Sequence, residues 1–153
     1  MRSSRFIVSL LLLTVATFAT SYLLTLERKV ALSKIIARVS VTSTTQAGCS
    51  ARVLEVLKGP TDLKVIDFHF APYGDYSVDK LPSMVGHEYY VFLHELDGWY
   101  WVLEGPAGIR PLADHYEERR VSDSREVIKE TYTRSNFVAR IRSLALQADP
   151  KKP

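Results

Sequence analysis

The Asp97-Gly98 pair constrains the fold of this chain more than any other feature. Aromatic and β-branched runs lie on both sides of it, from Tyr89 to Leu93 and from Trp99 to Leu103. Asp-Gly tolerates the positive φ angles of a two-residue turn, so the arrangement predicts a β-hairpin. Because apolar residues occupy both odd and even positions of the first run, we expect that strand to be buried on both faces.

Three segments before the hairpin alternate in hydrophobicity, which predicts strands with one face on a core. The first begins at Lys34, with Ile35, Ala37, Val39 and Val41 on the expected core side. The second places Val53 and Leu57 on one side and stops at Lys58-Gly59-Pro60, because Gly-Pro cannot continue a ladder. The third runs from Leu63 to Phe70, with Ile66, Phe68 and Phe70 as its core face.

Two further segments complete this part of the chain. Residues 71–86 contain two prolines and two glycines without a sustained period, and predict a long surface loop. Loops of this length are uncommon in compact domains and often functional. Gly105-Pro106-Ala107-Gly108 then interrupts the pattern before a last short strand around Ile109 to Leu112.

After Ala113 the composition becomes charged, and we predict a helical extension over residues 114–148. Asp123 and Glu126 match a capping box, with Val127, Ile128 and Tyr132 following on one side of a helix. Ser135 can restart a helix, so we expect one kinked helix or two short ones. The apolar stripe of the second part consists of Phe137, Val138, Ile141, Leu144 and Ala145. Residues 149–153 should form a disordered tail.

Five or so short strands with a terminal helix predict a small closed or half-closed barrel. Residues 51–59 (ARVLEVLKG), 85–93 (VGHEYYVFL), 99–102 (WYWV) and 105–108 (GPAG) together resemble the netrin-like barrel of tissue inhibitors of metalloproteinases. The resemblance covers about residues 34–113. It implies a five-stranded barrel of the oligonucleotide/oligosaccharide-binding (OB) type in an extracytoplasmic protein that binds another macromolecule.

The single cysteine departs from that family. The metalloproteinase inhibitors approach their target's metal with an amino-terminal cysteine, whereas Cys49 is internal and has no partner for a disulfide. Neither that inhibitory mechanism nor the inhibitors' disulfide framework therefore carries over. We expect Cys49 to be a buried thiol, with intermolecular pairing as the alternative.

The run from Phe6 to Leu26 is nearly uncharged and follows Arg2 and Arg5. As a helix it approaches the roughly 30 Å thickness of the bilayer hydrocarbon, which predicts an uncleaved anchor. The alternative is a signal peptide cleaved near Ala19 or Ser21. Either interpretation places the following residues outside the cytoplasm, with residues 1–33 as leader and linker.

Charge outside this leader is balanced. Arg2 and Arg5 precede Glu27, so 18 of the 20 basic residues remain against 17 acidic ones. Nucleic-acid-binding domains usually concentrate Lys and Arg on one face, whereas the two signs alternate here. We therefore expect no nucleic acid among the partners.

No constellation of catalytic residues is recognisable. Four histidines, His69, His87, His94 and His115, lie among Glu88, Glu95 and Asp114, but their spacing matches no compact metal signature. Cys49 has no adjacent histidine, and Gly-x-Ser-x-Gly is absent from the sequence. We expect no catalytic residue, no metal and no cofactor.

The hairpin suggests a binding surface instead. Alternation sends Trp99 and Trp101 to one face, with Tyr100 opposite. The indoles either fill a core or form an aromatic platform, to which Tyr73 and Tyr76 of the long loop would contribute. These four residues are the candidate binding site.

Taken together, the sequence predicts a mainly β protein with a C-terminal helix: a transmembrane or signal helix, then a small five-stranded OB-like barrel. The expected function is a non-enzymatic extracytoplasmic binding or assembly module, anchored to the inner or plasma membrane through residues 6–26. Its expected partner is a protein, which can itself be membrane-bound. The alternative is a secreted or periplasmic regulator or inhibitor of an envelope hydrolase.

Overall fold

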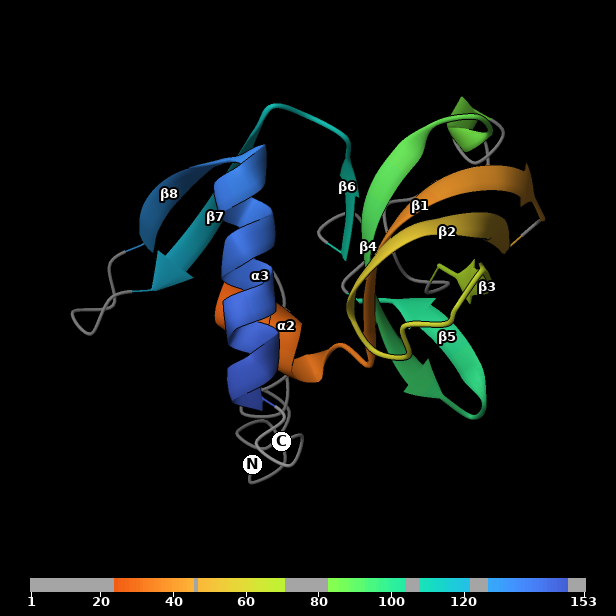
Figure 1. The fold of residues 1–153 in the computed structure, drawn as a ribbon, viewed down its shortest axis with the longest axis horizontal. Coiled ribbons are helices and arrows are strands. Elements are labelled where there is room, and N and C mark those ends of the chain that lie inside the picture. The colour runs from red at the N-terminus through yellow and green to blue at the C-terminus, as the bar shows by residue number, and fades with distance from the viewer. Residues whose placement is uncertain (1–23, 46, 71–82, 104–107, 122–126, 149–153) are drawn as a thin grey trace, which may run out of the picture.

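The computed structural model describes residues 24–45, 47–70, 83–103, 108–121 and 127–148. Figure 1 shows a β-barrel beside a layer that contains helices α2 (Leu26–Leu32) and α3 (Arg134–Ala148) and a two-stranded sheet. Most of the predicted leader, residues 6–23, lies outside the described residues, as does the predicted tail at 149–153. Within the described ranges, no helix is long and apolar enough to cross a membrane.

Five strands close the barrel, and its neighbouring strands are antiparallel except for the parallel pair β3–β5. In order around the barrel they are β1 (Ile35–Thr44), β2 (Gly48–Lys58), β3 (Val65–His69), β5 (Trp99–Val102) and β4 (Glu88–Leu96). β4 pairs back onto β1, and the short strand β6 (Ile109–Pro111) pairs with β4 as well. The prediction of a mainly β chain with a five-stranded barrel and a C-terminal helix is confirmed.

The barrel interior contains the predicted core residues. Ile35, Ala37, Val39 and Val41 of β1 are each at most 1% exposed. Ile66, Phe68 and Phe70 belong to the same cluster, together with Val91 and Leu93 of β4. Alternation therefore identified the inward faces of the first and third strands correctly.

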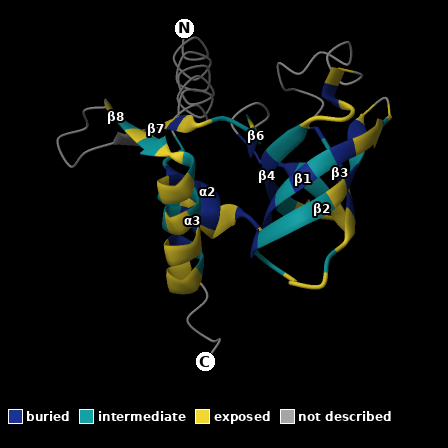
Figure 2. Cartoon of the chain, turned by 45° about the horizontal axis from the view of Figure 1, so that its top comes forward, coloured by how far each residue is buried: buried dark blue, intermediate teal, exposed yellow. Residues whose placement is uncertain are grey.

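A second core lies between the outer face of the barrel and the helical layer. Ile36 of β1 and Tyr90 and Phe92 of β4 pack there with Phe137 of α3. The outward side of α3 is exposed, while α2 contains buried residues beside it (Figure 2). β4 is consequently buried on both faces, as the sequence predicts.

The prediction that Val53 and Leu57 share a side of β2 is wrong. Val53 packs against the barrel core, whereas Leu57 belongs to the second core. The β1–β2 register shifts between Arg38 and Val39 and again between Ile36 and Ala37. Each β-bulge inserts one residue and reverses the phase of alternation, so side chains beyond it change faces.

The expectation of a helix between residues 114 and 133 is also wrong. β7 (His115–Val121) and β8 (Val127–Thr133) form an antiparallel pair there, and the proposed capping box at 123–126 lies outside the described residues. Tyr116 and Glu118 point inward, at 5% and 3% exposed. The alternation of β7 was not recognisable in the sequence, because Glu118 occupies an inward position and a charged residue usually marks a solvent face.

The second half of the predicted extension is correct. α3 begins at Arg134, and its stripe buries Phe137, Ile141 and Leu144 against the second core. Only residues 134–148 of the predicted helical segment 114–148 are therefore helical among those described.

The buried carboxylate of Glu118 on β7 forms ion pairs with two cations. Its Oε2 accepts from Lys29 Nζ of α2 at 2.8 Å, and its Oε1 accepts from Arg110 Nη2 of β6 at 2.7 Å. The Lys29 and Glu118 side chains are only 5% and 3% exposed. This buried ion triad joins α2, the barrel strand β6 and the β7–β8 hairpin.

The turn between β4 and β5 has the geometry that Asp-Gly predicts. Asp97 and Gly98 both have positive φ, at 53° and 79°, as a type I′ turn requires. A Cβ added at Gly98 would meet nothing within 4 Å, so any cost of substitution there arises from the backbone conformation.

We expect Gly98→Val to lower the free energy of unfolding by about 1–3 kcal/mol, because a β-branched residue strongly disfavours positive φ. Gly98→Asn is the matched control and should lose less, since asparagine tolerates this conformation. Chemical denaturation of both variants measures the difference. An unchanged denaturation curve for the valine variant would contradict the hairpin assignment.

Glu118→Ala should destabilise the fold by about 3–5 kcal/mol, because it leaves the buried Lys29 ammonium without a counter-ion. Asp114→Ala removes the partner of Arg134 from an exposed pair, in which the Asp114 side chain is 88% exposed. That control should change stability by less than about 1 kcal/mol. Equal losses in urea denaturation would show that the triad contributes no more than a surface ion pair.

Candidate functional site

The β3–β5 side of the barrel lies away from α3 and the β7–β8 hairpin (Figure 1). No described helix or strand packs over it. Three aromatic side chains gather on this side: His69 at the end of β3, and Trp99 and Trp101 of β5. We call these three residues the aromatic face.

The rings of the aromatic face are in direct contact. His69 lies edge-on to Trp99, with ring centroids 5.1 Å apart and an interplanar angle of 84°. The His69 and Trp101 centroids are 5.3 Å apart at 42°. His69 therefore stands between the two indoles and holds them as one cluster.

The alternation of β5 explains which rings point outward. Tyr100 packs against the barrel core, while Trp99 is 57% exposed and Trp101 is partly buried. The sequence left two interpretations open for the indoles, core packing and an aromatic platform. Core packing does not describe Trp99. Tyr73 and Tyr76, the other two candidate residues, lie outside the described residues.

Strand pairing brings His69 to the tryptophans, because His69 pairs with Trp101 across the parallel strands β3 and β5. Extending this register by two residues sets Asp67 opposite Trp99. The predicted core face of β3, Ile66, Phe68 and Phe70, leaves Asp67 and His69 on the opposite face. Only the closed barrel places β5 next to β3, and the sequence did not predict either residue as a binding residue.

Two exposed acidic residues lie near the aromatic face in sequence or in strand register. Asp67 accepts a hydrogen bond from Ser50 Oγ, and Asp97 lies in the turn two residues before Trp99. Both are exposed, and no lysine or arginine among the described residues forms an ion pair with either. The whole hairpin, residues 88–103, contains three acidic residues and no lysine or arginine.

Two polar atoms beside the aromatic face are buried without a hydrogen-bond partner among the described residues: Trp101 Nε1 and His94 Nδ1. The two residues are opposite each other in the β4–β5 register. Buried ring nitrogens usually have partners.

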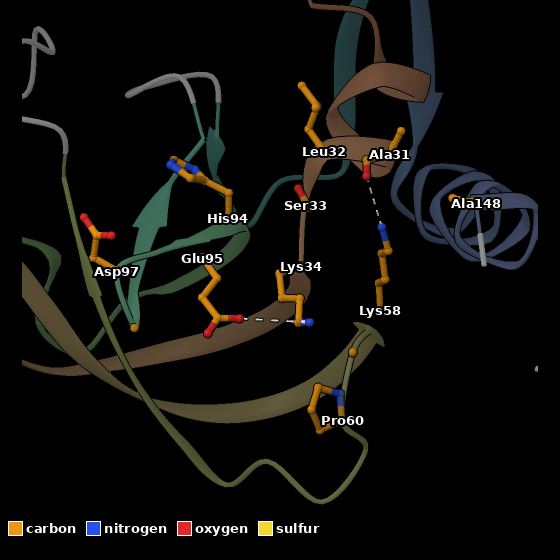
Figure 3. A pocket seen from close by; sticks show the side chains of 12 residues that line it. Ala31, Leu32, Ser33, Lys34, Lys58, Pro60, His94, Glu95, Asp97 and Ala148 are labelled. Atoms are coloured by element: carbon orange, nitrogen blue, oxygen red, sulfur yellow. Dashed lines mark hydrogen bonds and ion pairs between the residues drawn. The ribbon is translucent and has the colours of Figure 1, made fainter. Parts of the chain in front are cut away.

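A cleft of about 990 Å³ lies below the barrel, between the α2–β1 connection and the β4–β5 turn. Figure 3 shows Lys34 directed at Glu95 on one side and Lys58 directed at the carbonyl of Ala31 on the other. The Lys34–Glu95 distance is 4.0 Å, and Lys58 Nζ also donates to Val30 O at 2.7 Å. Both lysines of the cleft therefore have partners within the protein: a carboxylate for Lys34 and backbone carbonyls for Lys58.

A second groove, of about 670 Å³, is lined by residues of β1, β2 and β4 and of the first half of α3. Its arginines also have acidic partners: Arg38 lies near Glu55 and Glu88, and Arg142 donates to Glu55 at 2.6 Å. Burial raises the pKa of Tyr90 at the base of this groove. The Arg142–Glu55 contact links α3 to β2, whereas the Arg38 pairs join strands of the barrel.

His69 on β3 and His94 on β4 both pair with Trp101 in the strand register, whereas His87 precedes β4 and His115 lies on β7. No group of three or more His, Cys, Asp or Glu residues in the described part of the chain is placed to hold a metal ion.

No protein-family model, curated protein or solved structure matches this chain.

Cys49 is buried in the barrel core at 3% exposed, and burial raises the pKa of its thiol to about 11. The folded-state pKa lies above the ordinary value of 9.0, so the stabilising contribution is complete below about pH 9 and is lost as the pH rises through about 11. Thiolate is the reactive form, and a shift of this size disfavours nucleophilic chemistry.

We therefore expect the native protein to react with iodoacetamide at pH 8 at least about a hundredfold more slowly than the chain unfolded in guanidinium. Mass spectrometry of the alkylated protein measures both rates. Comparable rates in the two states would contradict the burial of Cys49.

Proposed function

We propose that this protein is a non-enzymatic extracytoplasmic binding or assembly module. Residues 6–26 anchor it to the inner or plasma membrane, and the barrel binds a protein partner. The observation that carries the proposal is the exposed indole of Trp99, which contacts His69 beside Trp101 on a barrel side that no described element covers. Tryptophan is among the residues that dominate the binding energy of protein interfaces.

The strand order supports an OB-type barrel and agrees with the netrin-like resemblance. The barrel follows the order β1-β2-β3-β5-β4 and closes from β4 to β1. OB-type barrels bind ligands on the face of their second and third strands and through the loop between the fourth and fifth. Here β3 supplies Asp67 and His69, and the Asp97-Gly98 turn leads directly into Trp99.

The chemistry of the aromatic face favours binding over catalysis. Ser50 donates its hydroxyl hydrogen to Asp67 and not to a histidine, so the serine–histidine contact of acyl transfer is missing from this pair. Cys49, the sole cysteine, is buried with a raised pKa. The aromatic rings supply contact area and stacking, which are properties of an interface.

Crosslinking and capture of the full-length protein from its native membranes should recover a defined protein partner. Trp99→Ala should reduce that recovery at least tenfold, because truncation of a central interface tryptophan costs about 2 kcal/mol or more. Leu146→Ala is the matched control, since Leu146 is 77% exposed on α3.

Recovery that is unchanged by Trp99→Ala, or lost equally in both variants, would contradict the aromatic face as the binding surface. Circular dichroism melting of both variants verifies that they remain folded. The exposure of both side chains makes large stability changes unexpected.

A further inference from the structure

From the charges around the aromatic face, we infer that it recognises an arginine side chain of the protein partner, stacked on the indole of Trp99 and paired with the carboxylate of Asp67. This inference rests on the proposed binding function and specifies its chemistry. It concerns residues on β3, β5 and their neighbouring turn, all of which the structure describes.

The aromatic part of the argument comes from the accessibility of Trp99. His69 meets this indole edge-on, and the side chain retains 57% of its exposure. The π face of tryptophan is electron-rich and attracts cations more strongly than the rings of tyrosine and phenylalanine do. An exposed indole fixed by a neighbouring ring is thus a preorganised cation acceptor.

The electrostatic part comes from carboxylates without counter-ions. Extending the His69–Trp101 register by two residues sets Asp67 opposite Trp99 on the adjacent strand, and Asp97 precedes Trp99 by two residues. Within the described residues, neither has an ion-pair partner, whereas Glu88 pairs with Arg38 and Glu95 with Lys34. Of the three carboxylates in this hairpin, the one without an ion-pair partner among the described residues is therefore that of Asp97, two residues before the exposed indole.

Arginine fits this combination better than other cations. Its planar guanidinium stacks on an aromatic ring while its N–H groups donate to a carboxylate. Asp67 supplies that carboxylate, since the hydrogen bond from Ser50 reaches only its Oδ1. A lysine ammonium forms the same charge contact but lacks the planar stacking surface.

Tryptophan fluorescence measures binding at this surface directly, because the sequence contains only two tryptophans and both belong to the aromatic face. The probe is the blocked peptide Gly-Arg-Gly-Arg-Gly, titrated into the full-length protein in a non-ionic detergent. Two matched peptides replace arginine with citrulline, which is planar but neutral, or with glutamate. Tryptophan fluorescence follows binding at 20 mM and 200 mM salt.

We expect a saturable change with the arginine peptide, binding at least fivefold weaker for the citrulline peptide, and no change with the glutamate peptide. The arginine affinity should fall at the higher salt concentration, because exposed charges are screened. Asp67→Asn should weaken arginine binding about fivefold, as the loss of one exposed charge contact implies. Glu117→Gln removes an exposed carboxylate on β7 and should leave binding unchanged.

Asp97→Asn provides a second variant, because asparagine accepts the positive φ of the turn as well as aspartate does. Equal binding of the arginine and citrulline peptides, no fluorescence change with arginine, or full binding by Asp67→Asn would overturn the inference. A dimer of the protein alone that Asp67→Asn dissociates in sedimentation would also overturn it, since the cation would then belong to a second copy. If Trp99→Ala loses the captured partner while arginine and citrulline bind equally, only the cation is excluded and the proposed function stands.

Discussion

The structure depends on two barrel strands that are apolar on both faces. β1 and β4 direct Ile35, Val91 and Leu93 into the barrel and Ile36, Tyr90 and Phe92 away from it. Full burial of each large apolar side chain contributes about 1.5–3 kcal/mol, so the outer face favours a covering layer. The ring of Phe137 supplies its centre: it stacks on Tyr116 at 4.3 Å and lies within 6.4 Å of Tyr90, Phe92 and Tyr132.

Apolar packing alone is non-directional, whereas the ion triad fixes the relative positions of the groups that it joins. Lys29, Arg110 and Glu118 belong to α2, β6 and β7, and their ion pairs join these three segments. Because a buried carboxylate needs both cations in hydrogen-bonding positions, the triad restricts how the hairpin docks on the barrel. The charge at Glu118 thus takes part in the second core rather than in the solvent surface.

No described helix or strand covers the β3–β5 side of the barrel. The β3–β5 contact has a single assigned residue pair, His69 with Trp101, and these two rings are in contact across it. One side of the barrel thus packs against the chain's own helical layer, and the β3–β5 side carries the aromatic face.

The sequence by itself determined the features that depend on neighbouring residues. The Asp97-Gly98 hairpin, the inward faces of β1 and β3, and the stripe of α3 follow from backbone preferences and periodicity, which are local. The placement of Trp99 and Trp101 on one face of the hairpin was determined in the same way. Only the tertiary structure decided that this face points outward, that β2 contains bulges, that Glu118 points inward and that His69 meets the tryptophans. These depend on which distant strands pair, and periodicity along one strand contains no information about its neighbour.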